Sequence, residues 1–168
     1  MRRQLALVRH AKAEQGAPDI ARRLTDRGRA DAYEIGRWLR DRNVVPNVAI
    51  VSPATRTMQT WEYASSTLGA THGRSATRPY VLFDAKVWAN TVSDLVAAIA
   101  EQPDEVTTVA IVGHNPSMHA LAVRLAGSAA GLSEFPTATV ALFTLGDWRD
   151  LDGAELVAHA TCRADKAG

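Results

Sequence analysis

The sequence predicts an α/β protein, a three-layer sandwich whose mostly parallel central sheet carries helices on both faces. Short apolar runs rich in β-branched residues alternate along the chain with longer segments whose apolar residues recur at helical spacing. Strands that alternate with helices build such layers because each connecting helix packs back onto the sheet. The 168 residues contain no repeat and no linker rich in Pro, Gly or Ser, so we expect a single domain over residues 1–168.

The expected strands are short apolar runs bounded by polar or turn-forming residues. In chain order they span Leu5–Val8, Val48–Val51, Tyr80–Phe83, Val106–Val112, Thr139–Leu145 and Glu155–His159. The residues after the last strand, from about 163 to 168, are expected to form a frayed tail.

The expected helices have residues with capping chemistry at their ends. Thr25 is placed to cap the first helix. Asn115 and Pro116 suit the N-cap and the first helical position of the last helix, and Gly127 suits its end. These helices span residues 25–42, 53–68, 93–101 and 116–125.

The composition is that of a globular protein and narrows the range of functions. The chain has 19 Lys and Arg against 18 Asp and Glu, a formal net charge of +1, which argues against a general nucleic-acid binder. Sixteen of the cations are Arg, an excess explained either by codon usage or by the binding of a planar anion such as phosphate. The single Cys162 excludes an intrachain disulfide and a Cys-based zinc site. No apolar stretch approaches the ~20 residues of a membrane span, and no signal peptide is evident, so we expect a cytoplasmic protein.

Three of the expected strands end in residues suited to a phosphoryl group. In α/β sheets, ligands bind outside the C-terminal ends of the strands. These ends carry Arg9 and His10, Ser52 to Arg56, and Gly113 to Asn115. Guanidinium groups bind phosphate oxygens in a forked geometry, and an imidazole can act as a nucleophile or as a proton donor. The sequence therefore predicts a phosphate site built from Arg9, His10, Arg56 and His114.

The same strand ends carry three sequence motifs. They are Leu-Val-Arg-His-Ala at 7–11, Ser-Pro-Ala-Thr-Arg-Thr-Met-Gln-Thr at 52–60 and Val-Gly-His-Asn-Pro-Ser at 112–117. They resemble the motifs of the histidine phosphatase superfamily, and more narrowly those of its SixA-like branch, the phosphohistidine phosphatases. The segment from Asp19 to Gly28 is similar to the family's Asp-x-x-Arg-Pro-Leu-Thr-x-x-Gly pattern, with Arg23 in place of Pro. The resemblance implies a phosphoglycerate mutase-like fold.

The resemblance also implies a phosphatase that works through a phosphohistidine intermediate. His10 is then the nucleophile, and Arg9 and Arg56 bind the phosphoryl oxygens. We expect the two arginines to lower the pKa of His10 by like-charge repulsion and so keep it unprotonated. His114 then donates a hydrogen bond to the phosphoryl group, and no metal or cofactor is required. The expected partner is a phosphorylated protein or a small phosphorylated metabolite, not a nucleic acid or a membrane.

Two residues near these motifs have alternative roles. Arg22 either binds the substrate phosphate or pairs with Asp19 or Asp26. Ser52 either supports the site through its hydroxyl or caps the following helix.

The sequence gives fewer indications of which residues contact the leaving group. Asn115 and Trp88 are candidates for substrate binding, with Trp88 at the pocket rim. Asp84, just after the third strand, is the best-placed acid to protonate a leaving group. A P–N bond to histidine needs less help from an enzyme acid, because water can protonate the leaving imidazole.

Two alternative functions are open at the level of the sequence. One is a phosphate-binding adaptor without turnover. The other is a phosphoglycerate mutase-like phosphoryl transferase, which needs an enclosed site that retains the transferred group. Turnover of a phosphoester or of a phosphohistidine peptide separates the phosphatase from the adaptor.

Overall fold

The structure is a computed structural model that describes residues 1–16, 18–69, 78–127 and 131–165. Within these residues, a six-stranded sheet has the strand order β3-β2-β4-β1-β5-β6. The first four strands in this order are parallel, and β5 and β6 are antiparallel to their neighbours, which confirms a mostly parallel sheet. The strands are β1 (Arg3–Arg9), β2 (Val48–Val51), β3 (Tyr80–Phe83), β4 (Thr108–Gly113), β5 (Thr139–Leu145) and β6 (Glu155–Thr161).

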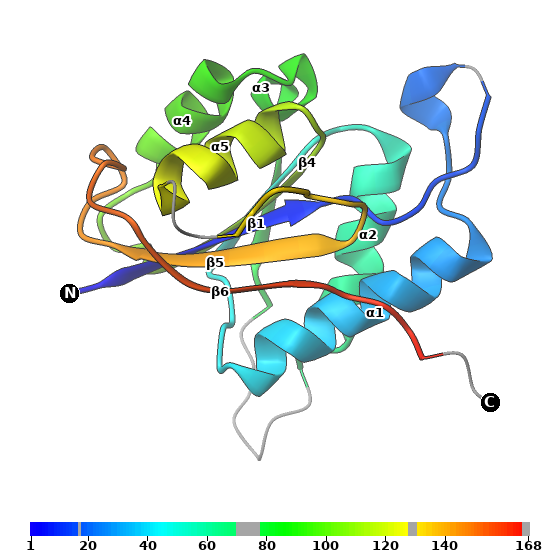
Figure 1. Ribbon diagram of the computed structural model, residues 1–168, viewed down its shortest axis with the longest axis horizontal. Helices are drawn as coiled ribbons and strands as arrows, with labels where there is room; N and C mark the ends of the chain where they lie inside the picture. Colours follow the sequence, from blue (N-terminus) through cyan, green and yellow to red (C-terminus); the bar gives the residue numbers. More distant parts are fainter. Residues whose placement is uncertain (17, 70–77, 128–130, 166–168) are drawn as a thin grey trace.

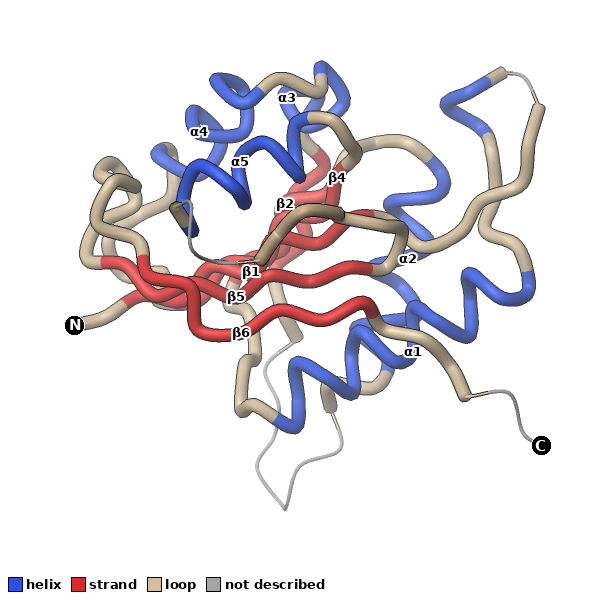
Figure 2. Tube along the Cα trace, viewed as in Figure 1, coloured by secondary structure: helices blue, strands red, loops and turns tan. Residues whose placement is uncertain are grey.

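Helices cover both faces of this sheet (Figures 1 and 2), as the sequence predicts. α1 (Asp26–Asp41) and α2 (Thr55–Ser66) lie on one face. α3 (Ala85–Ala89), α4 (Val92–Ala100) and α5 (Ser117–Ala126) lie on the other. Among the helices that the structure describes, none is long and apolar enough to cross a membrane.

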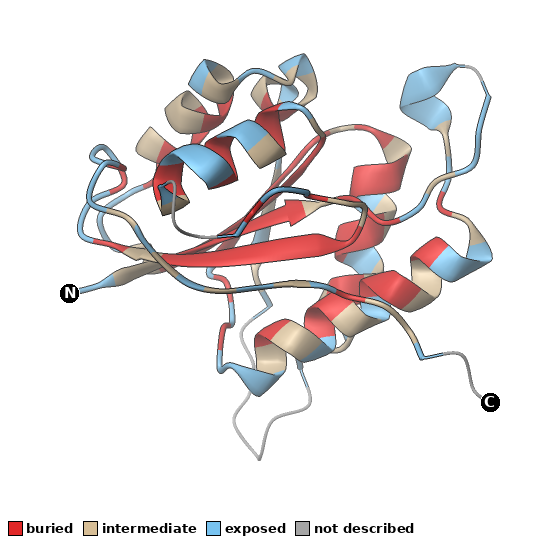
Figure 3. Ribbon diagram, in the orientation of Figure 1, coloured by how far each residue is buried: buried red, intermediate tan, exposed pale blue. Residues whose placement is uncertain are grey.

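Alternate residues of β1 show why both faces are covered. Leu5 and Leu7 belong to the core that includes residues of α4 and α5. Ala6 and Val8 belong to the core that includes residues of α1 and α2. All four side chains are fully buried, because a central strand of a parallel sheet packs against helices on both sides. Figure 3 shows this burial on the sheet and on the helix faces turned toward it.

The register of the parallel strands brings their C-terminal ends to one edge of the sheet. Arg9 pairs with Gly113 across β1 and β4. The His10 amide donates to the Gly113 carbonyl at 3.1 Å, and the Ser52 amide donates to the Val112 carbonyl at 3.1 Å. The residues that follow β1, β2 and β4 are therefore neighbours, although they lie far apart in the sequence.

The expected strands and helices are all present, with ends within one or two residues of the expected ones. Two short elements were not expected: α3, and a 3-10 helix, η1, over Asp19–Ala21. Both are too short for their residues to show a helical repeat of apolar positions. These two elements nevertheless carry or flank residues that line the site described below.

The capping predictions had different outcomes. Thr25 caps α1 as expected, since its hydroxyl accepts a hydrogen bond from the Gly28 amide at 3.0 Å. Asn115 is not the N-cap of α5, because Pro116 holds that position. The Asn115 side chain instead donates through Nδ2 to the Phe135 carbonyl at 2.9 Å. A hydrogen bond to a distant segment thus replaces the expected local cap.

The C-terminal segment was expected to be frayed from about residue 163, but residues 163 and 164 are held by hydrogen bonds. The Ala164 amide donates to Oδ1 of Asp31 at 2.9 Å, and Arg163 Nη1 donates to the Thr137 carbonyl at 2.8 Å. Asp31 is only 1% exposed, and a buried carboxylate needs such partners to offset its desolvation. The remainder of the expected tail, residues 166–168, lies outside the described residues.

Candidate active site

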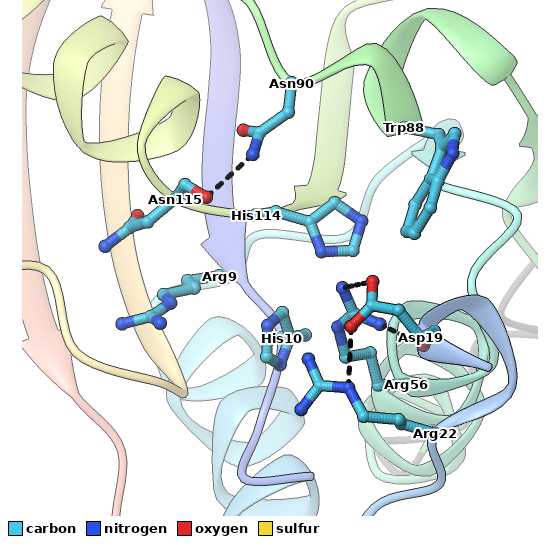
Figure 4. A pocket seen from close by; sticks show the side chains of 9 residues that line it. All are labelled: Arg9, His10, Asp19, Arg22, Arg56, Trp88, Asn90, His114 and Asn115. Atoms are coloured by element: carbon cyan, nitrogen blue, oxygen red, sulfur yellow. Dashed lines mark hydrogen bonds and ion pairs between the residues drawn. The ribbon is translucent and has the colours of Figure 1, made fainter. Parts of the chain in front are cut away.

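A pocket of about 360 Å³ opens at the C-terminal ends of β1 and β4 (Figure 4). Its lining is strongly basic and contains two imidazoles and one carboxylate. The lining residues are Arg9, His10, Asp19, Arg22, Arg56, Trp88, Asn90, His114 and Asn115. The structure thus brings together all the expected site residues except Ser52 and Asp84, and it adds Asp19 and Asn90.

His10 is held by the main chain in one tautomer. Its Nδ1 lies 2.7 Å from the Ala11 carbonyl, and a carbonyl oxygen only accepts, so Nδ1 carries the proton. Burial lowers the pKa of His10 to about 3, so the ring is neutral at pH 7. A neutral ring protonated at Nδ1 leaves the Nε2 lone pair free, which is the state that a nucleophile requires.

The cause of this low pKa differs from the expected one. We expected repulsion from Arg9 and Arg56, but loss of solvent around the 7%-exposed ring is the largest cause. The neighbouring His114, with its ring centroid 5.4 Å away, comes next among the groups that lower the pKa, ahead of the two arginines. The difference arises because burial depends on the packed neighbours of the ring, which the sequence does not reveal.

His114 is oriented by Ser52. Its Nε2 lies 2.8 Å from Oγ of Ser52, and both residues are buried. Burial, followed by the charge of Arg56, lowers the pKa of His114 to about 4, so this ring is also neutral. The Ser52 hydroxyl also accepts a long contact of 3.4 Å from the Ala54 amide, but α2 has no side-chain cap. Of the two roles expected for Ser52, the structure favours support of the site, because the hydrogen bond to His114 is shorter than the contact with the Ala54 amide.

Arg9 and Arg56 reach the pocket with hydrogen-bonding capacity to spare. Arg9 Nη1 donates to the Phe135 carbonyl at 3.0 Å, and Arg56 Nη1 donates to the Asp19 carbonyl at 2.9 Å. Among the described residues, four buried atoms of the pocket side chains have no hydrogen-bond partner: Nε of Arg9 and Arg56, Nδ1 of His114 and Oδ1 of Asn115. The two guanidinium groups can only donate, and unsatisfied buried donors are costly, so the arginines favour a ligand with acceptor oxygens.

Asp19 and Arg22 form the side of the pocket nearest η1. Arg22 Nε donates to Oδ1 of Asp19 at 2.8 Å, so the expected ion pair with Asp19 forms, and Arg22 also lines the pocket. Asp26, the other expected partner, pairs with Arg29. Partial burial raises the pKa of Asp19, but the charges of Arg56 and Arg22 outweigh this and hold that pKa below its usual value. Asp19 is therefore ionised at neutral pH.

Asn90 was missed by the sequence reasoning. It ends α3 in the left-handed region, with φ of 62°, and its Nδ2 donates to the Asn115 carbonyl at 2.8 Å. Its Oδ1 accepts hydrogen bonds from the amide and the hydroxyl of Ser117, at 3.1 and 2.6 Å. Through these hydrogen bonds Asn90 stabilises the turn that follows His114. The available signal was weak: Asn is one of the few residue types that tolerate this backbone region.

The segment after β3, which forms α3, places Trp88 in the pocket lining and Asp84 outside it. Trp88 packs edge-on against His114 with ring centroids 5.4 Å apart, and its ring lies 5.6 Å from the Arg56 guanidinium carbon. Asp84 instead caps α3, accepting from the Lys86 amide at 2.9 Å and pairing with the Lys86 ammonium group at 3.7 Å. Asp84 is therefore held at the start of α3 and, contrary to the expectation that it faces the leaving group, is not among the residues that line the pocket.

Sequence comparison relates the chain to one family. A sequence model of the Histidine phosphatase superfamily (branch 1) matches residues 5–77. Protein ML1117 of Mycobacterium leprae is 32% identical over 167 residues, which cover 90% of this chain and 97% of that protein. Protein Rv1276c of Mycobacterium tuberculosis is 30% identical over 156 residues, which cover 86% of this chain and 92% of that protein.

Solved structures agree with this relationship. A protein assigned as the phosphohistidine phosphatase SixA from Nakamurella multipartitia matches with a TM-score of 0.82 and 29% identity, over 96% of this chain and 97% of that one. Another protein so assigned, from Agrobacterium tumefaciens, matches with a TM-score of 0.76 and 28% identity, over 94% and 97%. The protein histidine phosphatase SixA complexed with tungstate shares the fold, with a TM-score of 0.76 and 22% identity over 94% of this chain and 96% of that one. From the motif-bearing pocket and these similarities together, the chain belongs to the histidine phosphatase superfamily and is a phosphatase of its SixA-like branch.

Proposed function

We propose that this phosphatase hydrolyses a phosphohistidine or a phosphomonoester through a covalent phosphohistidine intermediate on His10, without a metal. The observation that carries the proposal is the state of His10: buried, neutral, protonated at Nδ1 by its bond to Ala11, and free at Nε2. This nitrogen lies in a pocket whose other polar groups are mainly donors suited to phosphoryl oxygens.

The first step transfers the phosphoryl group to the enzyme. The Nε2 lone pair of His10 attacks phosphorus, an N–P bond forms, and the bond from phosphorus to the leaving group breaks with its electron pair. Arg9, Arg22 and Arg56 stabilise the charge on the equatorial oxygens, and His114 donates to one of them. The leaving group takes a proton from solvent.

The second step returns the enzyme to its starting state. Water attacks phosphorus, the N–P bond breaks, and its electron pair returns to Nε2 of His10. The proton lost by the water goes to solvent, and inorganic phosphate is the product. His10 is then again neutral and free at Nε2.

The pocket favours substrates whose leaving group departs without an enzyme acid. Asp19 is the carboxylate of the lining, and its arginine partners keep it ionised, so it is not a proton donor at neutral pH. A phosphohistidine suits such a site because its leaving imidazole accepts a proton readily from water. Two of the similar proteins are assigned as phosphohistidine phosphatases, which supports the same substrate class.

Turnover by matched variants tests the proposal. Wild-type protein, His10→Ala and His159→Ala are incubated with a phosphohistidine peptide and with a chromogenic phosphomonoester, each with and without EDTA. His159 is an exposed residue of β6 and serves as the matched control. We expect activity in the wild type and the control, none in His10→Ala, and no effect of EDTA.

Detection of the intermediate completes this test. Rapid acid-free quenching followed by mass spectrometry should find one added phosphoryl group on the peptide that contains His10. Turnover by His10→Ala at the wild-type rate would contradict the nucleophile assignment, and loss of activity with EDTA would contradict the metal-free mechanism. Activity on neither substrate would favour the adaptor.

A further inference from the structure

Asp19 binds two of the guanidinium groups that the proposed function assigns to the phosphoryl oxygens. Its Oδ2 accepts from Arg56 Nη2 at 3.3 Å, and its Oδ1 accepts from Arg22 Nε at 2.8 Å. Figure 4 shows this carboxylate in contact with both guanidinium groups, with Arg56 between Asp19 and His10 in this view. Carboxylate and phosphate compete for guanidinium groups because both present paired oxygens to the same fork.

The charge of the pocket shows what this competition achieves. Three guanidinium groups and one carboxylate line it, and its two histidines are neutral, so the pocket carries two positive charges. Inorganic phosphate at neutral pH is largely a dianion, so product and pocket are matched in charge. Without the carboxylate, the same pocket would carry three positive charges and would hold the product more tightly.

The two partners differ in their freedom to move. The Arg56 side chain is 6% exposed, whereas the Asp19 side chain is 58% exposed. A largely exposed carboxylate can turn into water without losing its hydration, while a buried guanidinium stays where its packing holds it. Asp19 is therefore the member of this ion pair that can yield to an incoming phosphoryl group and return when that group leaves.

We propose that Asp19 is an internal competitor of the product: it takes the guanidinium groups of Arg56 and Arg22 as inorganic phosphate departs and thereby speeds product release. This inference rests on the proposed function, because it takes phosphate as the product of the site. Asp19 acts through the arginines and not on the reacting atoms, so it is a positioning residue.

Calorimetric titration with inorganic phosphate at pH 7.5 tests this role without requiring turnover. We expect Asp19→Asn and Asp19→Ser, both uncharged, to bind phosphate on the order of tenfold more tightly than wild type, because each removes a charge that repels the product. Asp26→Asn is the control, since Asp26 lies in the same region, pairs with Arg29 and does not line the pocket. Its affinity should match that of the wild type.

Product inhibition gives the kinetic counterpart of this measurement. In the two Asp19 variants the inhibition constant for phosphate should fall by the same factor as the dissociation constant, and kcat should fall if release limits turnover. Damage to the fold would weaken binding, so a gain in affinity separates the proposed role from a merely structural one.

The possible results separate this inference from the proposed function. Unchanged or weaker phosphate binding in both variants would overturn the role of Asp19, and weaker binding would show that the carboxylate serves to hold Arg22 and Arg56 in place. Absence of phosphate binding in the wild type and in both Asp19 variants would overturn the proposed function itself, together with this inference.

Discussion

Removal of the Ser52 hydroxyl tests how the second histidine of the pocket is held. Ser52 is fully buried and its Oγ lies 2.8 Å from Nε2 of His114, which is 4% exposed. The hydroxyl accepts only a long contact from the Ala54 amide, so its proton is available to His114 Nε2. We expect the hydroxyl to donate this bond, which would place the ring proton on Nδ1, a nitrogen with no partner among the described residues. In that arrangement Ser52 selects the tautomer that, under the proposed mechanism, donates to a phosphoryl oxygen.

The substitution Ser52→Ala has two calculable consequences. It leaves a buried ring nitrogen without a partner, which costs about 1–3 kcal/mol of unfolding free energy. It also frees His114 to adopt the other tautomer or to rotate, which removes a donor from the transition state. Removal of one such donor costs about 10²–10³-fold in kcat where the donor is lost entirely. Because His114 itself remains, we expect a smaller loss, about tenfold.

Urea denaturation and steady-state kinetics on the same preparation measure the two effects. We expect a lower midpoint with an unchanged urea dependence, and a fall in kcat that exceeds any rise in KM. Ser52→Thr keeps the hydroxyl and should recover part of kcat if the added methyl group fits. A Ser52→Ala enzyme with wild-type kcat would refute the idea that Ser52 sets the proton position on His114, whatever its stability.

Three other predictions concern pH and the residues that frame the site. The pKa of His10 is about 3 in the folded protein and near 6.5 when unfolded, so below pH 6.5 the unfolded chain binds the additional proton. The free energy of unfolding should therefore fall as the pH falls from 6.5 toward 3. The melting temperature, measured across this pH range, should fall less steeply in His10→Gln than in the wild type. An equal pH dependence in the two proteins would contradict the burial of a neutral His10. Asn90→Ala should lower kcat and destabilise the fold by about 1–3 kcal/mol, because it removes the hydrogen bonds to Asn115 and Ser117 and places Ala at positive φ. Steady-state kinetics and urea titration measure the two effects, and unchanged values would show that the turn after His114 does not depend on Asn90. Thr25→Ala removes the α1 cap and should cost about 1 kcal/mol by urea titration with unchanged kcat, a result that a drop in activity would contradict.

The elements and the four central site residues were predictable because their signals are local or topological. Apolar periodicity placed α1, and the Thr25 cap followed from side-chain chemistry at the helix start. The site followed from a single rule, that neighbouring parallel strands end at one edge, which brings His10 and His114 together. No packing detail was needed for either conclusion.

The residues that were missed or misplaced depend on contacts between distant segments. Asn115 fits a local N-cap rule, yet its side chain donates a hydrogen bond to the Phe135 carbonyl, twenty positions away. Asp84 lies near a strand end, as expected of an acid at this site, yet its carboxylate accepts a hydrogen bond from the Lys86 amide and caps α3. Asp19 reaches Arg56 only because η1 folds over the start of α2. A polar side chain with several possible partners is placed by whichever partner the fold brings closest.

The ionisation of His10 shows how burial changes the chemistry as well as the location of a residue. If repulsion from the arginines kept His10 neutral, any bound phosphate would weaken that repulsion and favour protonation of the nucleophile just when substrate arrives. Burial has no such dependence on the ligand, because the ring stays out of water with the pocket full or empty. Under the proposed mechanism we therefore expect the desolvated ring to stay unprotonated in the complex, while Arg9 and Arg56 bind the phosphoryl oxygens. The pKa of His10 therefore depends mainly on its burial and only to a smaller extent on the charges of Arg9 and Arg56.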